Sequence, residues 1–136
     1  MNNKVMIVDD SMLMRKILKK TFLTYSDFLV IEAGNGYDAL SAYEVTRPSI
    51  VTMDITMDGK DGITTASEIL ENDPEARIIM VTALGQQEVL NRCFSIGIYD
   101  FIVKPFREER VHKTLDKVMN KIINKEADHA QVSTFQ

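Results

Sequence analysis

The sequence predicts an α/β protein with a five-stranded parallel sheet, and three patterns lead to this prediction. Short apolar runs without polar alternation are typical of strands buried on both faces, as in a parallel sheet. Each run is followed by a segment with apolar residues at helical spacing. Four of the runs end directly in chemically useful polar residues. Five such repeats favour a doubly wound, flavodoxin-like sheet in strand order 2-1-3-4-5 with five helices.

The first two repeats have clear boundaries. Residues 5–8 predict the first strand, and Asp10 or Ser11 can cap the helix that follows. Residues 28–33 predict the second strand, which ends at the turn 34–36. The second helix must stop before Arg47, because a residue that precedes proline disfavours helix. The expected apolar stripes are Leu13, Ile17 and Phe22 on the first helix, and Ala39, Leu40 and Tyr43 on the second.

The last three repeats follow the same plan. Residues 50–53, 78–81 and 101–103 predict strands. The third helix should end at Asn72–Pro74, and Gly97 is suited to end the fourth. The expected stripes are Ile63, Ala66, Ile69 and Leu70 on the third helix, Val89, Leu90, Cys93 and Phe94 on the fourth, and Val111, Leu115, Val118 and Ile122 on the fifth.

Composition narrows the class of protein. A chain of 136 residues with 45% apolar and 26% charged residues is typical of one soluble domain. The net charge of −4 argues against nucleic-acid binding, which needs a basic patch. No apolar stretch approaches the roughly 20 residues of a membrane span, and we expect no signal peptide before Val5. The single cysteine, Cys93, is expected in the core and fits a reducing cytoplasm.

Polar residues follow four of the predicted strands. Because ligands bind beyond the carboxyl ends of parallel strands, we expect these side chains to meet at one edge of the sheet. Three neighbouring carboxylates repel one another, and a hard cation such as Mg²⁺ relieves that repulsion. A hydroxyl and an ammonium suit phosphate oxygens. We therefore predict a Mg²⁺-dependent phosphoryl-transfer site with Asp54 as nucleophile. The residues are Asp9, Asp10, Asp54, Thr82 and Lys104.

The motifs around these residues resemble the receiver domain of two-component response regulators. The resemblance spans roughly residues 4 to 123, and the run 82–87 is similar to single-domain members that act in chemotaxis. It implies a receiver domain over 1–123, with 124–136 as a helix extension or flexible tail. The motifs are Asp9-Asp10-Ser-x-x-x-Arg15, Asp54, Met57-x-x-x-Asp61-Gly62, Thr82-Ala83, Tyr99-Asp100 and Lys104-Pro105-Phe106.

The resemblance implies a role for each acidic residue. Asp54 would accept a phosphoryl group from the phosphohistidine of a histidine kinase, or from a small donor such as acetyl phosphate. Asp10, Asp54 and the backbone carbonyl of Thr56 would bind Mg²⁺ directly, and Asp9 would act largely through water. The protein would not be a turnover enzyme, since it would catalyse only phosphorylation of its own Asp54 and the loss of that group.

The resemblance also implies a switch. Thr82 and Lys104 would hold phosphate oxygens, Tyr99 would be the aromatic that turns inward as Thr82 moves, and the peptide bond before Pro105 would be cis. Phosphorylation adds a charge of about −1.5 to −2 at Asp54, so groups that can reach the phosphoryl oxygens shift position. The fourth helix, fifth strand and fifth helix would then bind a FliM-like flagellar motor switch protein. A CheA-like histidine kinase and a phosphatase are the other implied partners of a cytoplasmic monomer that binds neither nucleic acid nor membrane.

Two features leave alternatives open. Receivers usually carry proline four residues after the phosphorylated aspartate, whereas this chain has Asp58 followed by Gly59. Asp58 is interpreted either as a solvated turn residue or as a group that alters metal affinity or loop mobility. The expected last helix is basic, which indicates either a solvated face or a surface for an acidic partner. Its basic residues are Arg107, Arg110, Lys113, Lys117, Lys121 and Lys125.

Two other functions fit part of the pattern. A phosphorelay intermediate would pass its phosphoryl group on to a histidine phosphotransferase. A phosphatase of the haloacid dehalogenase type also uses an aspartate nucleophile with Mg²⁺. That family places Asp-x-Asp after its first strand, whereas here the candidate nucleophile follows the third strand.

Overall fold

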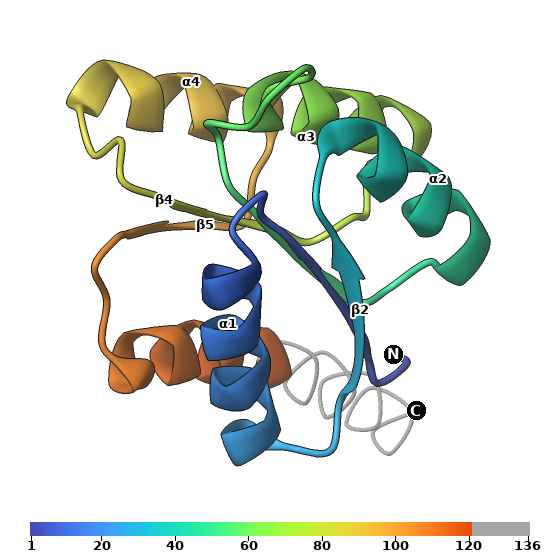
Figure 1. Cartoon of the computed structure of the whole chain (residues 1–136), viewed down its shortest axis with the longest axis vertical. Coiled ribbons are helices and arrows are strands. Elements are labelled where there is room, and N and C mark those ends of the chain that lie inside the picture. Colours follow the sequence, from blue (N-terminus) through green and yellow to red (C-terminus); the bar gives the residue numbers. More distant parts are fainter. Residues whose placement is uncertain (121–136) are drawn as a thin grey trace, which may run out of the picture.

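A computed structural model of the protein describes residues 1–120. Five parallel strands form one sheet in the order β2-β1-β3-β4-β5, as predicted (Figure 1). The strands are β1 Lys4–Val8, β2 Leu29–Ala33, β3 Ile50–Met53, β4 Ile78–Thr82 and β5 Asp100–Val103. The helices are α1 Met12–Tyr25, α2 Gly36–Thr46, α3 Gly62–Asn72 and α4 Gln87–Ile96, and residues 108–120 form a fifth helical segment.

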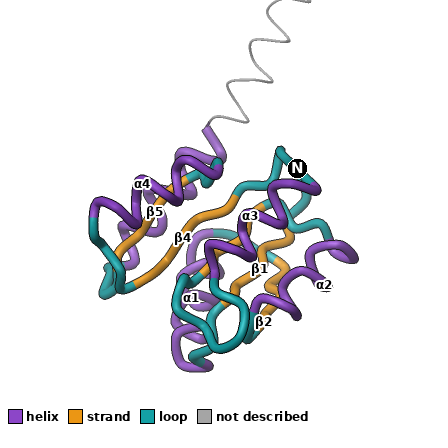
Figure 2. The backbone as a smooth tube through the Cα atoms, turned by 90° about the horizontal axis from the view of Figure 1, so that it is seen from above, coloured by secondary structure: helices purple, strands orange, loops and turns teal. Residues whose placement is uncertain are grey.

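Helices cover both faces of the sheet. α2, α3 and α4 lie side by side over one face, and α1 and the segment 108–120 cover the other (Figures 1 and 2). Neighbouring strand residues point to opposite faces, so each central strand supplies two cores. Met6, for example, packs in the core under α2 to α4, and Val5 packs in the core under α1. Burial on both faces explains the unbroken apolar runs in the sequence.

Local signals set the ends of the helices. The Ser11 hydroxyl accepts the Met14 N–H at 3.2 Å, so Ser11 rather than Asp10 caps α1. The Asp61 carboxylate accepts the Thr64 N–H at 2.9 Å at the start of α3. α4 ends at Gly97, which has the positive φ of 102° that glycine adopts without steric cost, as predicted. The caps at Ser11 and Asp61 fix the loops that follow β1 and β3 at the carboxyl edge of the sheet.

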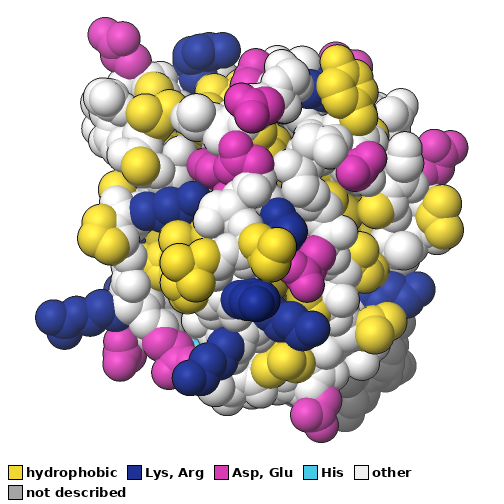
Figure 3. Space-filling model, in the orientation of Figure 1, with side chains coloured by type: hydrophobic (Ala, Val, Ile, Leu, Met, Phe, Trp, Pro, Cys, Tyr) yellow, Lys and Arg dark blue, Asp and Glu magenta, His cyan; other side chains and the backbone are white. Residues whose placement is uncertain are grey.

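The expected stripe on α1 is partly wrong. Leu13 and Ile17 are 68% and 42% exposed, whereas Leu18 and Phe22 are buried. Two rows of apolar residues on this helix have helical spacing, and the sheet contacts only the row that contains Leu18 and Phe22. Exposed apolar side chains and lysines therefore share the outer surface of α1 (Figure 3).

The other stripes are confirmed where the structure describes them, with one exception. Phe94 on α4 is 44% exposed, while Cys93 beside it is fully buried. The predicted Ile122 and the expected tail 124–136 lie outside the described residues. Among residues 1–120, no helix is both long enough and apolar enough to cross a membrane.

Candidate functional site at the carboxyl edge of the sheet

Three carboxylates meet where the central strands end. β1 and β3 are neighbours, with Val8 paired to Met53, so the residues that follow these two strands lie side by side. The Asp54 N–H donates to the Val8 carbonyl at 3.0 Å, which ties the two strand ends together. One oxygen each from Asp9, Asp10 and Asp54 lies within 4.8 Å of the others. Asp9 and Asp54 are buried and Asp10 is exposed, so the cluster opens to solvent on one side.

A single ammonium group lies between the two buried carboxylates. Lys104 follows β5, and its N–H donates to the Thr82 carbonyl at 2.8 Å. Its Nζ lies 2.8 Å from Asp9 Oδ2 and 3.3 Å from Asp54 Oδ2. The peptide bond between Lys104 and Pro105 is cis, as predicted. Lys104 therefore meets Asp9 and Asp54 at the carboxyl edge of the sheet, as expected from the positions of these residues after their strands.

The charges of Asp9, Asp10, Asp54 and Lys104 do not balance. Burial raises the pKa of Asp54, the nearby Lys104 ammonium lowers it, and repulsion from Asp9 raises it, with a net upward shift. Three carboxylates face one ammonium, so the cluster favours a further cation. Carboxylate oxygens are hard ligands of the kind that Mg²⁺ prefers. The set of donors therefore fits Mg²⁺.

Asp9 is held through its backbone as well as its carboxylate. Its N–H donates to the Ala33 carbonyl at 3.1 Å, and its Oδ1 accepts the Ser11 N–H at 2.9 Å. The Arg15 Nη1 donates to the Asp9 carbonyl at 2.6 Å, while Nε of the same guanidinium pairs with Glu32 at 3.0 Å. The sequence indicated Arg15 only as part of a motif. The ion pair between Arg15 and Glu32 on β2 could not be inferred from that motif.

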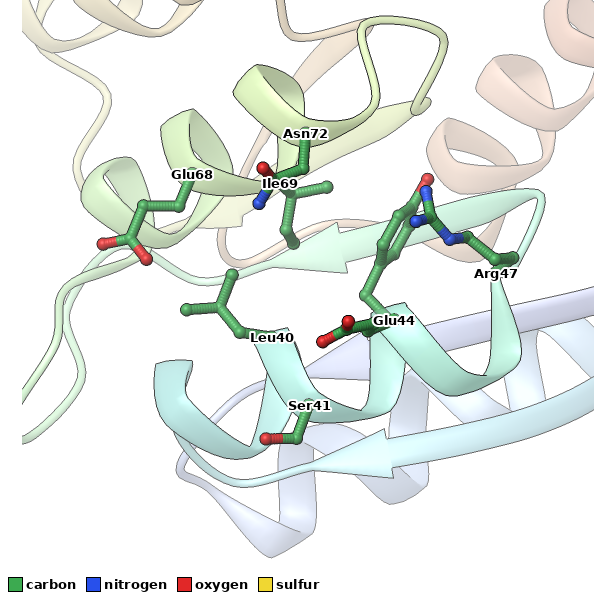
Figure 4. A pocket seen from close by; sticks show the side chains of 8 residues that line it. Leu40, Ser41, Glu44, Arg47, Glu68, Ile69 and Asn72 are labelled. Atoms are coloured by element: carbon green, nitrogen blue, oxygen red, sulfur yellow. The ribbon is translucent and has the colours of Figure 1, made fainter.

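A separate groove lies away from this edge. It has a volume of about 440 Å³ and lies between α2 and α3, with Leu40, Glu44 and Arg47 on one side and Glu68 and Asn72 on the other (Figure 4). None of the residues of the acidic cluster lines it. The chemistry that the sequence predicts therefore belongs to the carboxyl edge of the sheet.

Comparison with known proteins is consistent with this geometry. Residues 5–116 match the response regulator receiver domain family. The chain belongs to this family. The receiver is 42% identical to the chemotaxis protein CheY of Bacillus subtilis over 120 residues, which cover 88% of this chain and 100% of the relative. It is 43% identical to CheY of Thermotoga maritima over 118 residues, covering 87% and 98% of the two chains.

A solved structure resembles this receiver closely. It is the CheX–CheY–BeF₃–Mg²⁺ complex from Borrelia burgdorferi, which has a TM-score of 0.80 and 36% sequence identity. The match covers 85% of this chain and 88% of that one. The chain is thus a CheY-like response regulator receiver, in a family that acts in two-component signalling.

The two predicted switch residues lie at opposite ends of the β4–β5 pair. Thr82 is buried at the end of β4 and pairs with Val103, and its hydroxyl accepts the Leu84 N–H at 3.3 Å. Tyr99 lies at the opposite end of the strand pair, where its N–H donates to the Ile78 carbonyl at 2.7 Å. Tyr99 precedes Val103 by four positions, a span of roughly 13 Å in extended backbone. That Tyr99 turns inward as Thr82 moves stays a prediction.

The aromatic residue of β5 nearer to Thr82 is Phe101. It is buried, pairs with Met80, and lies two residues before Val103. The apolar pattern of residues 101–103 predicted this strand. Its pairing with β4, which places Phe101 nearer to Thr82 than Tyr99, could be seen only in the structure.

Proposed function

We propose that this receiver is a signalling switch, phosphorylated on Asp54 by a histidine kinase in a Mg²⁺-dependent reaction. The observation that carries the proposal is the convergence of Asp54 with Asp9, Asp10 and Lys104 at the carboxyl edge of the sheet. The family match and the relatives named CheY support it. We propose that the functional domain spans residues 1–123.

Each residue of the cluster has a proposed part in the reaction. An Asp54 oxygen attacks the phosphorus atom, and the bond from phosphorus to the donor nitrogen breaks as the new oxygen–phosphorus bond forms. The donor nitrogen keeps the electron pair of the broken bond. Lys104, already within 3.3 Å of Asp54, holds a phosphoryl oxygen, and the Thr82 hydroxyl donates to another.

The metal would be held by oxygen ligands of this chain. We propose Asp10, Asp54 and the Thr56 backbone carbonyl as direct ligands, with Asp9 acting largely through water. When bound, Mg²⁺ neutralises charge on the transferred group. The product is the modified protein itself, and the later hydrolysis of its acyl phosphate resets the switch, so the protein is not a turnover enzyme.

The output surface would lie over α4, β5 and the segment 108–120. Phe94 and Val103 are large apolar residues exposed there. Val103 also lines a hollow of about 560 Å³, together with Phe101, Pro105 and Phe106 among others. Since Thr82 pairs with Val103, movement of the Thr82 loop would reach this surface directly. We propose that the surface binds the flagellar motor switch protein in the cytoplasm.

Phosphorylation of a single site tests the proposal. The purified protein is incubated with Mg²⁺ and acetyl phosphate, its intact mass is measured directly, and the modified residue is located after borohydride reduction of the acyl phosphate. We expect one phosphoryl group, on Asp54. Asp54→Ala should remain unmodified, while Asp58→Asn, which changes a neighbouring exposed carboxylate, should still be labelled.

Two results would contradict the proposal. One is the absence of an adduct on the wild-type protein with acetyl phosphate and with beryllofluoride. The other is labelling that persists unchanged in Asp54→Ala. The motor assignment has its own test, because a strain that carries Asp54→Ala should stop switching the direction of flagellar rotation.

A further inference from the structure

The loop between β3 and α3, residues 55–61, lacks a proline and is exposed at its tip. It directly follows Asp54 and includes Thr56, the proposed carbonyl ligand. Asp58 and Gly59 form the exposed tip, and Gly59 has a φ of 82°. Nothing within the sequence of this turn restricts its backbone as a proline ring would. Its conformation therefore depends on contacts made elsewhere.

Lys60 supplies two of those contacts. Its Nζ lies 2.6 Å from Glu68 Oε1 on α3 and 5.1 Å from the centroid of the Tyr37 ring on α2. The Lys60 side chain is only 17% exposed, so its charge is partly shielded from solvent. Ion pairs and cation–π contacts gain strength as they lose water. One ammonium group thus links the loop to two different helices.

Packing around Lys60 reinforces this link. Gly36 begins α2, and a Cβ atom there would lie only 3.1 Å from Cβ and Cγ of Lys60, so the aliphatic stem packs against the start of the helix. A Cβ atom on Gly59 would lie 3.5 Å from the Tyr37 ring. The tip of the loop is therefore in contact with the first turn of α2.

The base of the same loop is closed next to Asp54. The Gly62 N–H donates to the Ile55 carbonyl at 2.8 Å, and a Cβ atom on Gly62 would overlap the Asp54 carbonyl. The segment from Ile55 to Gly62 is thus fixed at its base by backbone contacts and near its tip by Lys60. Thr56 lies between these two attachments.

We propose that Lys60 is a positioning residue, which holds the β3–α3 loop in the conformation that binds Mg²⁺ through its contacts with Glu68 and Tyr37. This inference rests on the proposed function of the acidic site. A loop that is already ordered loses less conformational freedom when the metal binds, so its affinity is higher. The contacts of Lys60 would take the place of a rigid proline turn.

A purely electrostatic role of Lys60 predicts the opposite change in Mg²⁺ affinity when Lys60 is removed. If Lys60 acted only as a positive charge near the cluster, its removal would strengthen Mg²⁺ binding, because a repelled cation would then meet less positive charge. If Lys60 positions the loop, its removal weakens binding. The direction of the change therefore separates the two roles.

Calorimetric titration with Mg²⁺ at matched ionic strength tests the proposal. We expect Lys60→Met to raise the Kd by about threefold to tenfold, a smaller effect than losing a group that directly orients a ligand. Lys60→Arg, which keeps the charge, should bind within about twofold of wild type. Lys19→Met, which removes an exposed lysine of α1, controls for the change in net charge.

A second measurement separates positioning from general loss of structure. With acetyl phosphate, Lys60→Met should need more Mg²⁺ for half-maximal phosphorylation but reach the wild-type rate at saturating Mg²⁺. Tyr37→Leu, at an exposed position, should shift the Kd in the same direction and keeps the idea testable if Lys60→Met does not fold. An unchanged or lower Kd in folded Lys60→Met would overturn the proposal. Failure of the wild-type protein to bind Mg²⁺ would instead overturn the proposed function.

Discussion

Lys104 shows how one side chain can serve two needs of the site. It pairs with Asp9 and Asp54 at 2.8 and 3.3 Å, and both carboxylates are buried. A buried carboxylate without a partner is costly, so the ammonium stabilises the folded protein before any metal binds. The same ammonium lies where a phosphoryl group on Asp54 would need positive charge. The residue therefore competes with the metal and assists the reaction.

Replacing Lys104 with methionine should separate these two effects. Mg²⁺ should bind more tightly, because the competing ammonium is gone. Phosphorylation by acetyl phosphate at saturating Mg²⁺ should become slower by on the order of 10²-fold, because a charged donor to the phosphoryl oxygens is lost. Calorimetry measures the first effect and rapid quench of the labelling reaction the second. A variant that is labelled as fast as wild type would show that Lys104 is not needed for transfer.

Arg15 contacts the site through the backbone. Its guanidinium bonds the Asp9 carbonyl at 2.6 Å and Glu32 at 3.0 Å, so it holds the turn that presents Asp10. Arg15→Gln should raise the Kd for Mg²⁺ by several-fold, within the roughly 10- to 100-fold range of groups that orient metal ligands. Glu32→Gln leaves the guanidinium in place and is the matched control. Equal affinities in Arg15→Gln and wild type, measured by calorimetry, would show that the turn holds itself.

At the scale of elements, local pattern was enough for most of the fold but not for long-range contacts. The runs before Asp9 and Asp54 predicted β1 and β3, and their neighbouring positions predicted the meeting of the carboxylates, because these features follow from strand burial and topology. The position of Tyr99 next to Ile78 depends on the register of β5 against β4, which is a pairing between distant residues. The bond from Lys60 to Glu68 likewise joins two elements and has no local signal.

β5 is joined to the segment 108–120 by a charged network around Asp100. Thr114 donates to Asp100 Oδ2 at 2.6 Å, and Arg110 Nη2 lies 3.4 Å from Oδ1. Burial alone would raise the pKa of Asp100, but the hydrogen bonds from Thr114, the Phe101 N–H and Arg110 outweigh it and lower the pKa below the usual 3.8. At least one basic residue of this helix, Arg110, therefore pairs with a carboxylate of the protein itself.

The lowered pKa of Asp100 gives a pH-dependent contribution to stability. Because the folded-state pKa lies below the unfolded value, the contribution is fully present above pH 3.8 and is lost as the pH falls through the folded-state pKa. Asp100→Asn should therefore be less stable than wild type by about 2 kcal/mol at neutral pH, the range for hydrogen bonds to a charged group. Urea unfolding at decreasing pH should show the difference shrink below pH 3.8. A difference that is constant with pH would rule out the carboxylate as its cause.

At the scale of the whole molecule, the acidic site exists only when the sheet is complete. Its residues lie between positions 9 and 104 of the chain, at the carboxyl ends of β1, β3, β4 and β5. The unfolded chain cannot bring these carboxylates together, so a metal that binds them binds the folded state alone. Its binding energy is then added to the stability of the entire sheet.

Mg²⁺ should therefore raise the unfolding free energy of the receiver by an amount set by its affinity. At a free concentration of 100 times the Kd the increase should be about 2.7 kcal/mol. Urea unfolding with and without Mg²⁺, compared with the Kd from calorimetry, checks this value. Asp10→Asn, at an exposed position that takes no part in the Lys104 ion pairs, should lose most of the increase while its metal-free stability stays close to that of wild type. If Asp10→Asn gained as much stability from Mg²⁺ as wild type, the ion would have to be binding elsewhere, and the cluster would hold its charge without it.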